Sequence, residues 1–242
     1  MTLRTVTCLV LSAFLLVFAS PALAGAEELS ESEKVVFSFF KLNNHVPAYE
    51  EWIKNSQVYK AETGSETAKS EIFEKEMLRL KWNYGTYDPA ADFIKIKTPV
   101  RLLLQGSTLA FIFPGAKPGE VPYFPFPYAK EWIALVLNDL DPLLELELSP
   151  AERAIAEKHV PKNTVIDGEV VLHARAVKAE NTEQLRLNEI DHWMLIGETG
   201  NFELSAGGTT LATYTAPWFL EAARRKKELE SLKSGSAPLL AQ

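Results

Sequence analysis

The sequence predicts an α+β fold, in which N-terminal helices pack on a mostly antiparallel sheet, one helix is inserted among the strands and an amphipathic helix follows them. Three observations predict it. Apolar residues recur at helical spacing from Leu29 to about Tyr84. Beyond Asp92 the hydrophobic period falls towards two, as in half-buried strands. Apolar residues make up 47% of the chain, which at this length is enough for one sizeable core.

Residues 1–24 have the three parts of a secretory signal peptide. Arg4 provides a basic start, an apolar run of about 12 residues follows from Cys8 to Ala19, and Ala22-Leu-Ala24 forms an A-x-A cleavage site. The run is well short of the roughly 20 residues that span a bilayer. We therefore expect cleavage after Ala24 and a periplasmic or secreted protein. A retained membrane anchor is the alternative.

The chain that remains after cleavage has 218 of the 242 residues and no cysteine, since Cys8 is the only one. An exported chain without disulfides is typical of a bacterial periplasm or medium. It keeps 24 basic and 32 acidic residues, a formal charge of −8, which argues against a nucleic-acid partner. No later run reaches membrane-spanning length. We expect a single domain over residues 25–233 and a flexible tail over 234–242.

The helical part of that domain, residues 29–84, divides into three helices. A capping box at 30–33 opens the first, which is apolar on most sides and is therefore expected to be buried. Pro47 starts the second, and Gly64 breaks it. The third runs over about 66–82, with apolar residues at spacings of four, three and four.

The sheet-rich part covers residues 92–233. The run 132–137 is apolar on both parities, so it is either a central strand or a buried helix. Ser149-Pro150 followed by Glu152 begins the inserted helix, and Pro217 opens the last one. Strands are expected at 92–97, within 98–105, and at 108–113, 144–148, 169–178, 184–196 and 209–215.

The chain carries no specific catalytic or cofactor motif. It has no G-x-S-x-G nucleophile elbow, no H-E-x-x-H helix, no P-loop and no EF-hand loop. Gly207-Gly208 and the acidic pair Asp139 and Asp141 are typical of turns. The basic cluster 224–227 is typical of a solvated helix face, with contact to an anionic lipid or a partner as the alternative. We expect no cofactor.

Two histidines form the most specific candidate cluster. Glu180-Asn-Thr-Glu183 is a polar break between two strand-length patterns, which predicts an antiparallel hairpin over 169–196. A turn centred near Thr182 places His173 opposite His192 on one face of the sheet. With a carboxylate, two imidazoles can hold a divalent metal. Because Arg175 lies beside them, we expect no bound metal.

A second candidate is the stretch VPYFPFPY, residues 121–128. Each proline fixes its own φ and favours extended backbone before it, and the missing N–H groups exclude a central strand. The stretch is therefore an edge strand or a connector. Extended geometry places Phe124, Phe126 and Tyr128 on one side and Tyr123 on the other. We interpret it mainly as a stiff connector that lines the core, with a ligand-contacting lip as the alternative.

The region from Phe126 to Glu152 combines proline-flanked aromatics, a strand that runs into Asn-Asp-Leu-Asp-Pro, and the segment Leu-Glu-Leu-Ser-Pro-Ala-Glu. In this it resembles a family of signal-peptide-bearing bacterial proteins catalogued only as a domain of unknown function. The resemblance extends over about residues 35–178. It implies an exported bacterial α+β domain and supplies no activity or functional residue.

Together these features favour an exported, non-catalytic binding or envelope-associated protein, whose partner is an unknown ligand or an envelope protein. The alternative is a hydrolase or a metal-assisted enzyme whose active-site residues the sequence does not identify. The candidate binding residues are Tyr123, Phe124, Phe126, Tyr128, His173 and His192.

Overall fold

A computed structural model describes residues 29–114 and 122–235. The predicted signal peptide and its cleavage site lie outside these residues. The helices are α1 (Glu31–Leu42), α2 (Tyr49–Asn55), α3 (Gln57–Ala61), α4 (Glu66–Thr86), α5 (Pro150–His159) and α6 (Pro217–Gly235), with a 3-10 turn η1 (Asp141–Leu143). The strands are β1 (Ile94–Gln105), β2 (Thr108–Ile112), β3 (Tyr123–Tyr128), β4 (Glu131–Leu137), β5 (Glu145–Glu147), β6 (Val165–Leu187), β7 (Ile190–Ala206) and β8 (Thr209–Thr215).

The eight strands form one sheet, in which seven follow the order β3-β4-β7-β6-β1-β2-β5 and β8 pairs with β7 off this path. The long strand β7 pairs with β6 along one edge and divides its other edge between β4 and β8. Of these pairs, only β4 with β7 is parallel. The α+β class and the mostly antiparallel sheet predicted from the sequence are thus confirmed.

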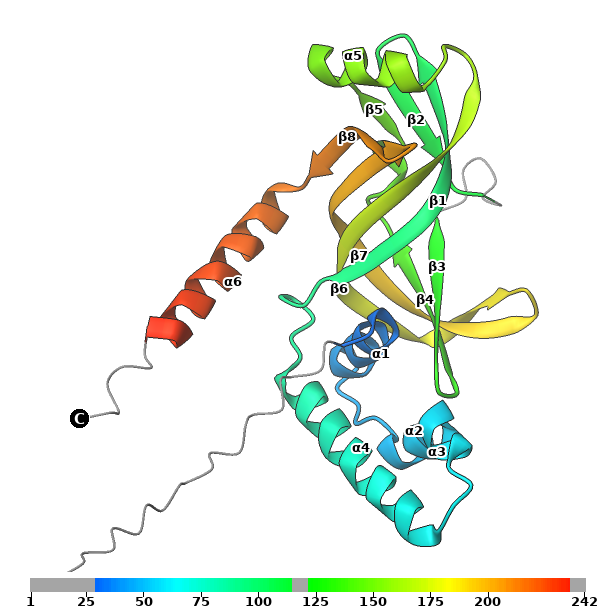
Figure 1. Cartoon of the computed structure of the whole chain (residues 1–242), viewed down its shortest axis with the longest axis vertical. Helices are drawn as coiled ribbons and strands as arrows, with labels where there is room; N and C mark the ends of the chain where they lie inside the picture. Colours follow the sequence, from blue (N-terminus) through cyan, green and yellow to red (C-terminus); the bar gives the residue numbers. More distant parts are fainter. Residues whose placement is uncertain (1–28, 115–121, 236–242) are drawn as a thin grey trace, which may run out of the picture.

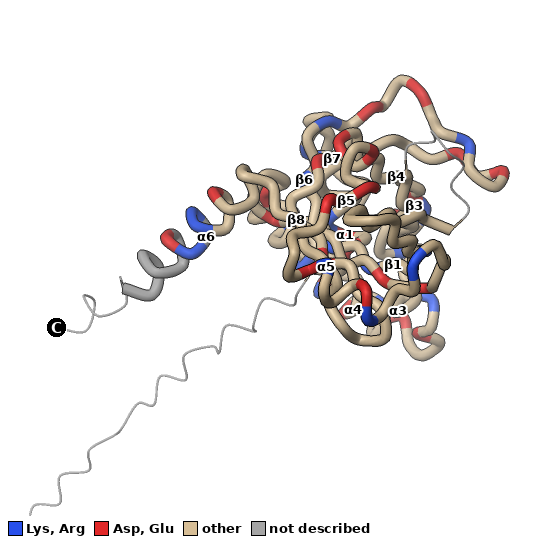
Figure 2. Tube along the Cα trace, turned by 90° about the horizontal axis from the view of Figure 1, so that it is seen from above, with Lys and Arg blue, Asp and Glu red and all other residues tan. Residues whose placement is uncertain are grey.

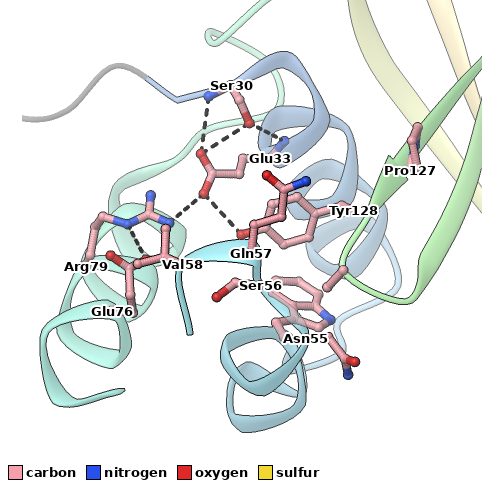
Figure 3. A pocket seen from close by; sticks show the side chains of 12 residues that line it. Ser30, Glu33, Asn55, Ser56, Gln57, Val58, Glu76, Arg79, Pro127 and Tyr128 are labelled. Carbon is pink, nitrogen blue, oxygen red and sulfur yellow. Dashed lines mark hydrogen bonds and ion pairs between the residues drawn. The ribbon is translucent and has the colours of Figure 1, made fainter. Parts of the chain in front are cut away.

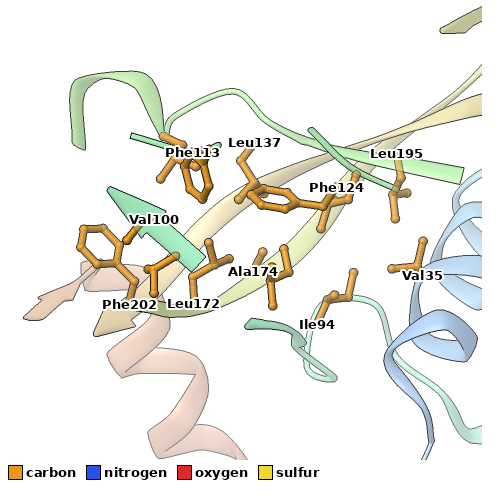
Figure 4. Packing of buried hydrophobic residues seen from close by; sticks show 14 of the residues in the cluster. Val35, Ile94, Val100, Phe113, Phe124, Leu137, Leu172, Ala174, Leu195 and Phe202 are labelled. Atoms are coloured by element: carbon orange, nitrogen blue, oxygen red, sulfur yellow. The ribbon is translucent and has the colours of Figure 1, made fainter. Parts of the chain in front are cut away.

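The sheet curls around its own apolar face (Figure 1). Strands β2 and β3 stand near opposite ends of the strand order, yet Phe113, just after β2, packs edge-on against Phe124 of β3 with ring centroids 5.4 Å apart. The ring of Phe111 likewise lies 5.4 Å from that of Phe202 on β7. Alternate residues of the strands therefore fill the enclosed space, as the close-up of the core shows (Figure 4).

Helices cover the two ends of this curled sheet (Figure 1). Helices α1 and α5 both begin as their sequences predict. Ser30 and Glu33 form the capping box of α1, and Ser149 and Glu152 form that of α5. Helix α1 contacts five strands, and its Val35 and Phe37 are fully buried. Helices α2, α3 and α4 pack beyond α1, and α2 also contacts the end of the β3–β4 hairpin. The expected second helix is divided in two, because Ser56 ends α2 and also caps α3.

The two ambiguous segments of the sequence are both strands. Residues 132–137 lie in β4, a central strand between β3 and β7, and so are not a helix. The proline-rich stretch forms β3, at the edge of the sheet. Pro125 and Pro127 share one parity, so both can point their missing N–H groups away from β4.

The predicted hairpin turn at 180–183 is wrong. Strand β6 continues through these residues with a bulge, where Glu180 accepts hydrogen bonds from the backbone N–H and the hydroxyl of Thr182. The chain turns instead at Asn188-Glu189, both with positive φ (47° and 68°), as a two-residue hairpin turn requires. The polar composition of residues 180–183 is thus compatible with a solvent-exposed strand as well as with a turn.

The last helix is confirmed, but only its first turn packs on the sheet. Trp218 stacks on the guanidinium of Arg175, 4.1 Å from the ring centroid, and Phe219 contacts Phe93. Gly200 makes room for the ring of Phe219, since a Cβ at position 200 would lie 2.3 Å from that ring. Beyond this turn α6 leaves the body of the protein (Figure 2). It runs to Gly235, two residues into the expected tail.

We predict that Glu189→Gly stabilises the protein. Glycine adopts positive φ without the cost of about 1 kcal/mol that a side chain incurs there. The expected rise in melting temperature is about 2–4 °C, measured by circular dichroism. Glu183→Gly is the matched control and should lower the melting temperature, because Glu183 lies within β6. If Glu183→Gly had the higher melting temperature of the two variants, the turn would lie at 180–183, as the sequence suggested.

Candidate functional site

An open cleft of about 660 Å³ lies where the N-terminus of α1, the α2–α3 junction, α4 and the β3–β4 turn meet (Figure 3). Its walls carry three charged side chains, two aromatic rings and several small polar groups. The charged residues are Glu33, Glu76 and Arg79, and the aromatic ones are Trp52 and Tyr128. These residues come from four separate elements, so the cleft exists only in the folded chain.

Glu33 is the most constrained of these residues, with 6% of its surface exposed. Its Oε1 accepts hydrogen bonds from the Tyr128 hydroxyl at 3.1 Å and from Nη2 of Arg79 at 2.9 Å. Its Oε2 accepts from the backbone N–H and the hydroxyl of Ser30, at 3.2 and 3.3 Å. A carboxylate offers about four acceptor positions. All four positions of Glu33 are therefore occupied.

Arg79 joins the two carboxylates of the cleft. Its Nε donates to Oε2 of Glu76 at 2.9 Å, while Nη2 contacts Glu33. Burial alone would lower the pKa of Arg79, but the hydrogen bonds to Glu33 and Glu76 outweigh it and raise that pKa. The guanidinium therefore stays charged, and the three groups together carry a formal charge of −1.

Tyr128 and Trp52 form the aromatic wall. Their rings meet edge to face with centroids 5.1 Å apart, and the Trp52 indole N–H donates to Glu131 at 3.3 Å. The pKa of Tyr128 is raised, first by burial and then by the charge of Glu33. Tyr128 therefore remains a neutral hydrogen-bond donor at physiological pH.

The structure brings Tyr128, alone of the six candidate binding residues, into the cleft. Phe124 and Phe126 face the core, whereas Tyr123 lies on the other side with 43% of its surface exposed. The alternation predicted for these rings is thus confirmed, and most of the stretch lines the core as expected. Their role in ligand binding stays a prediction.

The predicted pairing of His173 with His192 is wrong, because the true turn shifts the register. His173 lies opposite Asn201, whose side-chain oxygen is 2.8 Å from Nδ1, and His192 lies opposite Leu185. His192 and Asn201, the partner of His173, both lie on β7 and are separated by about 30 Å of extended strand. Burial lowers the pKa of His173 below its usual value. Within residues 29–114 and 122–235, no group of three or more His, Cys, Asp or Glu side chains is arranged to hold a metal.

The sequence did not single out Glu33, Glu76 or Arg79 as functional residues. Glu33 had a complete local explanation as the capping residue of α1, and Glu76 and Arg79 form an ordinary i, i+3 pair on a helix. No local pattern shows that Glu33 lies beside Tyr128, which is 95 residues away along the chain.

A scan of protein-family models, a search of curated proteins and a search of solved structures found no match to this chain. In the part of the chain that the structure describes, no helix is long and apolar enough to cross a membrane.

We predict that Glu33→Gln destabilises the protein by about 3 kcal/mol, because it leaves Arg79 without its buried partner and presents an amide N–H₂ to donors. Chemical denaturation measures the change. Glu74→Gln removes an exposed carboxylate from α4 and is the matched control, with an expected change below about 0.5 kcal/mol. Equal stability of the two variants would contradict the role of Glu33.

Proposed function

We propose that this chain is an exported, non-catalytic protein that binds a small polar molecule in the cleft between α1, α3, α4 and the β3–β4 turn. One observation carries the proposal: the charged groups of the cleft are held in place by one another before any ligand arrives. A preorganised polar wall lowers the ordering cost of binding. The volume of the cleft lies in the range of small-molecule sites.

The same contacts argue against Glu33 and Tyr128 as catalytic groups. A general base needs a free lone pair, and each acceptor position of Glu33 already takes a hydrogen bond. The Tyr128 hydroxyl donates a hydrogen bond to Glu33, and the raised pKa of Tyr128 opposes its ionisation. The groups at the centre of the cleft therefore act as a fixed scaffold.

The two exposed valines near this region allow a direct test of binding. Val58 lines the cleft and Val46 lies outside it, and both are largely exposed. We predict that Val58→Trp fills the cleft and abolishes ligand binding, whereas Val46→Trp leaves it unchanged. A thermal-shift screen of polar metabolites against both variants and the wild type measures this. The proposal fails when no compound stabilises the wild type, or when every stabilising compound acts equally on Val58→Trp.

Export rests on the predicted signal peptide, residues 1–24. We expect the chain expressed in a bacterial host to be exported and to begin at Gly25. N-terminal sequencing of the periplasmic and medium fractions checks this. A sequence that starts at Met1 would contradict it.

A further inference from the structure

We infer that the ligand of the cleft is a small zwitterion that carries one ammonium and one carboxylate group, as a free amino acid does. The inference rests on the proposed binding function and names the class of molecule that fits it. It comes from the hydrogen-bonding positions that the scaffold leaves open at Arg79 and Glu76.

Arg79 keeps donors for a ligand. A guanidinium has five N–H groups in a fixed fork. Nε donates to Glu76 and Nη2 to Glu33, whereas Nη1 makes no hydrogen bond to any residue in the described ranges. The side chain lines the cleft and is 23% exposed. Arginine N–H groups in such a setting bind carboxylates strongly and with defined geometry.

Glu76 keeps an acceptor beside those donors. Its Oε2 accepts from Nε of Arg79, and its Oε1 takes no hydrogen bond from the described parts of the chain. The Glu76 side chain is also 23% exposed and lines the same cleft. An ammonium group is the natural partner for such an oxygen, since it carries three donors and a positive charge.

The charge of the cleft decides among ligand classes. Glu33, Glu76 and Arg79 sum to −1, so an anion without a cationic group meets a repulsive field. A simple cation pairs with Glu76 but leaves Nη1 of Arg79 without a partner. A zwitterion satisfies both open positions and adds no net charge.

The spacing of these groups favours a single amino acid over a longer peptide. Nε of Arg79 and Oε2 of Glu76 are bonded at 2.9 Å, so the open Nη1 and Oε1 belong to adjoining side chains that one small zwitterion can reach together. A free amino acid carries both charges on a short frame, whereas a long peptide holds its terminal charges far apart. Val58, Pro127 and Ala129 form the less polar part of the lining and are available to the rest of the ligand.

The experiment compares free α-amino acids with derivatives that lack one charge. Calorimetric titration of the wild-type protein with each amino acid, its amide and its N-acetyl form should give measurable binding for at least one free amino acid. Both derivatives of that amino acid should bind at least about 10-fold more weakly. Each missing charged hydrogen bond would cost about that factor or more.

Variants assign the binding to the cleft. Glu76→Gln keeps an oxygen that accepts from Nε of Arg79 but loses the negative charge, so it should weaken amino-acid binding about 10-fold or more. Glu74→Gln removes an exposed carboxylate two positions before Glu76; it is the matched control and should bind as the wild type does.

Each remaining outcome has a definite meaning. Amino-acid binding that is unchanged in Glu76→Gln or in Val58→Trp would overturn the inference. A second outcome is that no amino acid binds, while a polar compound without a zwitterionic group binds the wild type but not Val58→Trp. This result would overturn the ligand class and leave the binding function standing. No binding by any compound would overturn the binding function itself.

Discussion

The buried carboxylate of Glu33 is the interaction on which the geometry of this protein's helical end depends. It joins the first turn of α1, the end of the edge strand β3 and the middle of α4, through Ser30, Tyr128 and Arg79. An ionised carboxylate removed from water is costly unless charge and hydrogen bonds replace its hydration. Here four hydrogen bonds do so, one of them from the guanidinium of Arg79, and a change in any of the three elements disturbs the other two.

The cleft is a consequence of that junction. Its floor consists of groups that bind one another, and its rim comes from the α2–α3 junction and the β3–β4 turn. In that turn Ala129 adopts a positive φ of 52°, and Lys130 forms an ion pair with Glu51 of α2. The turn is therefore tied to the helices on the far side of the cleft.

The parts of the fold that the sequence predicted well are those determined by local chemistry. The caps at Ser30 and Ser149 depend on residues three positions apart, and the alternation in the strands depends on neighbours two positions apart. The hairpin of β6 and β7 was misplaced because the polar residues 180–183 are compatible with both a turn and a solvated strand. Only pairing with β7 distinguishes the two, and pairing is a property of the whole sheet. The cleft was missed for the same reason, since its charged residues converge from distant parts of the chain.

The proline-rich stretch shows how one short sequence meets two requirements at once. An edge strand with free N–H groups invites another chain to pair with it, and Pro125 and Pro127 remove those donors from β3. The prolines also keep the strand extended, which directs Phe124, Phe126 and Tyr128 to the same side. The first two rings reach the core, and the last reaches Glu33 because the sheet ends there. The protection of the edge and the placement of the tyrosine in the cleft therefore have the same cause, and substitution of either proline would affect both.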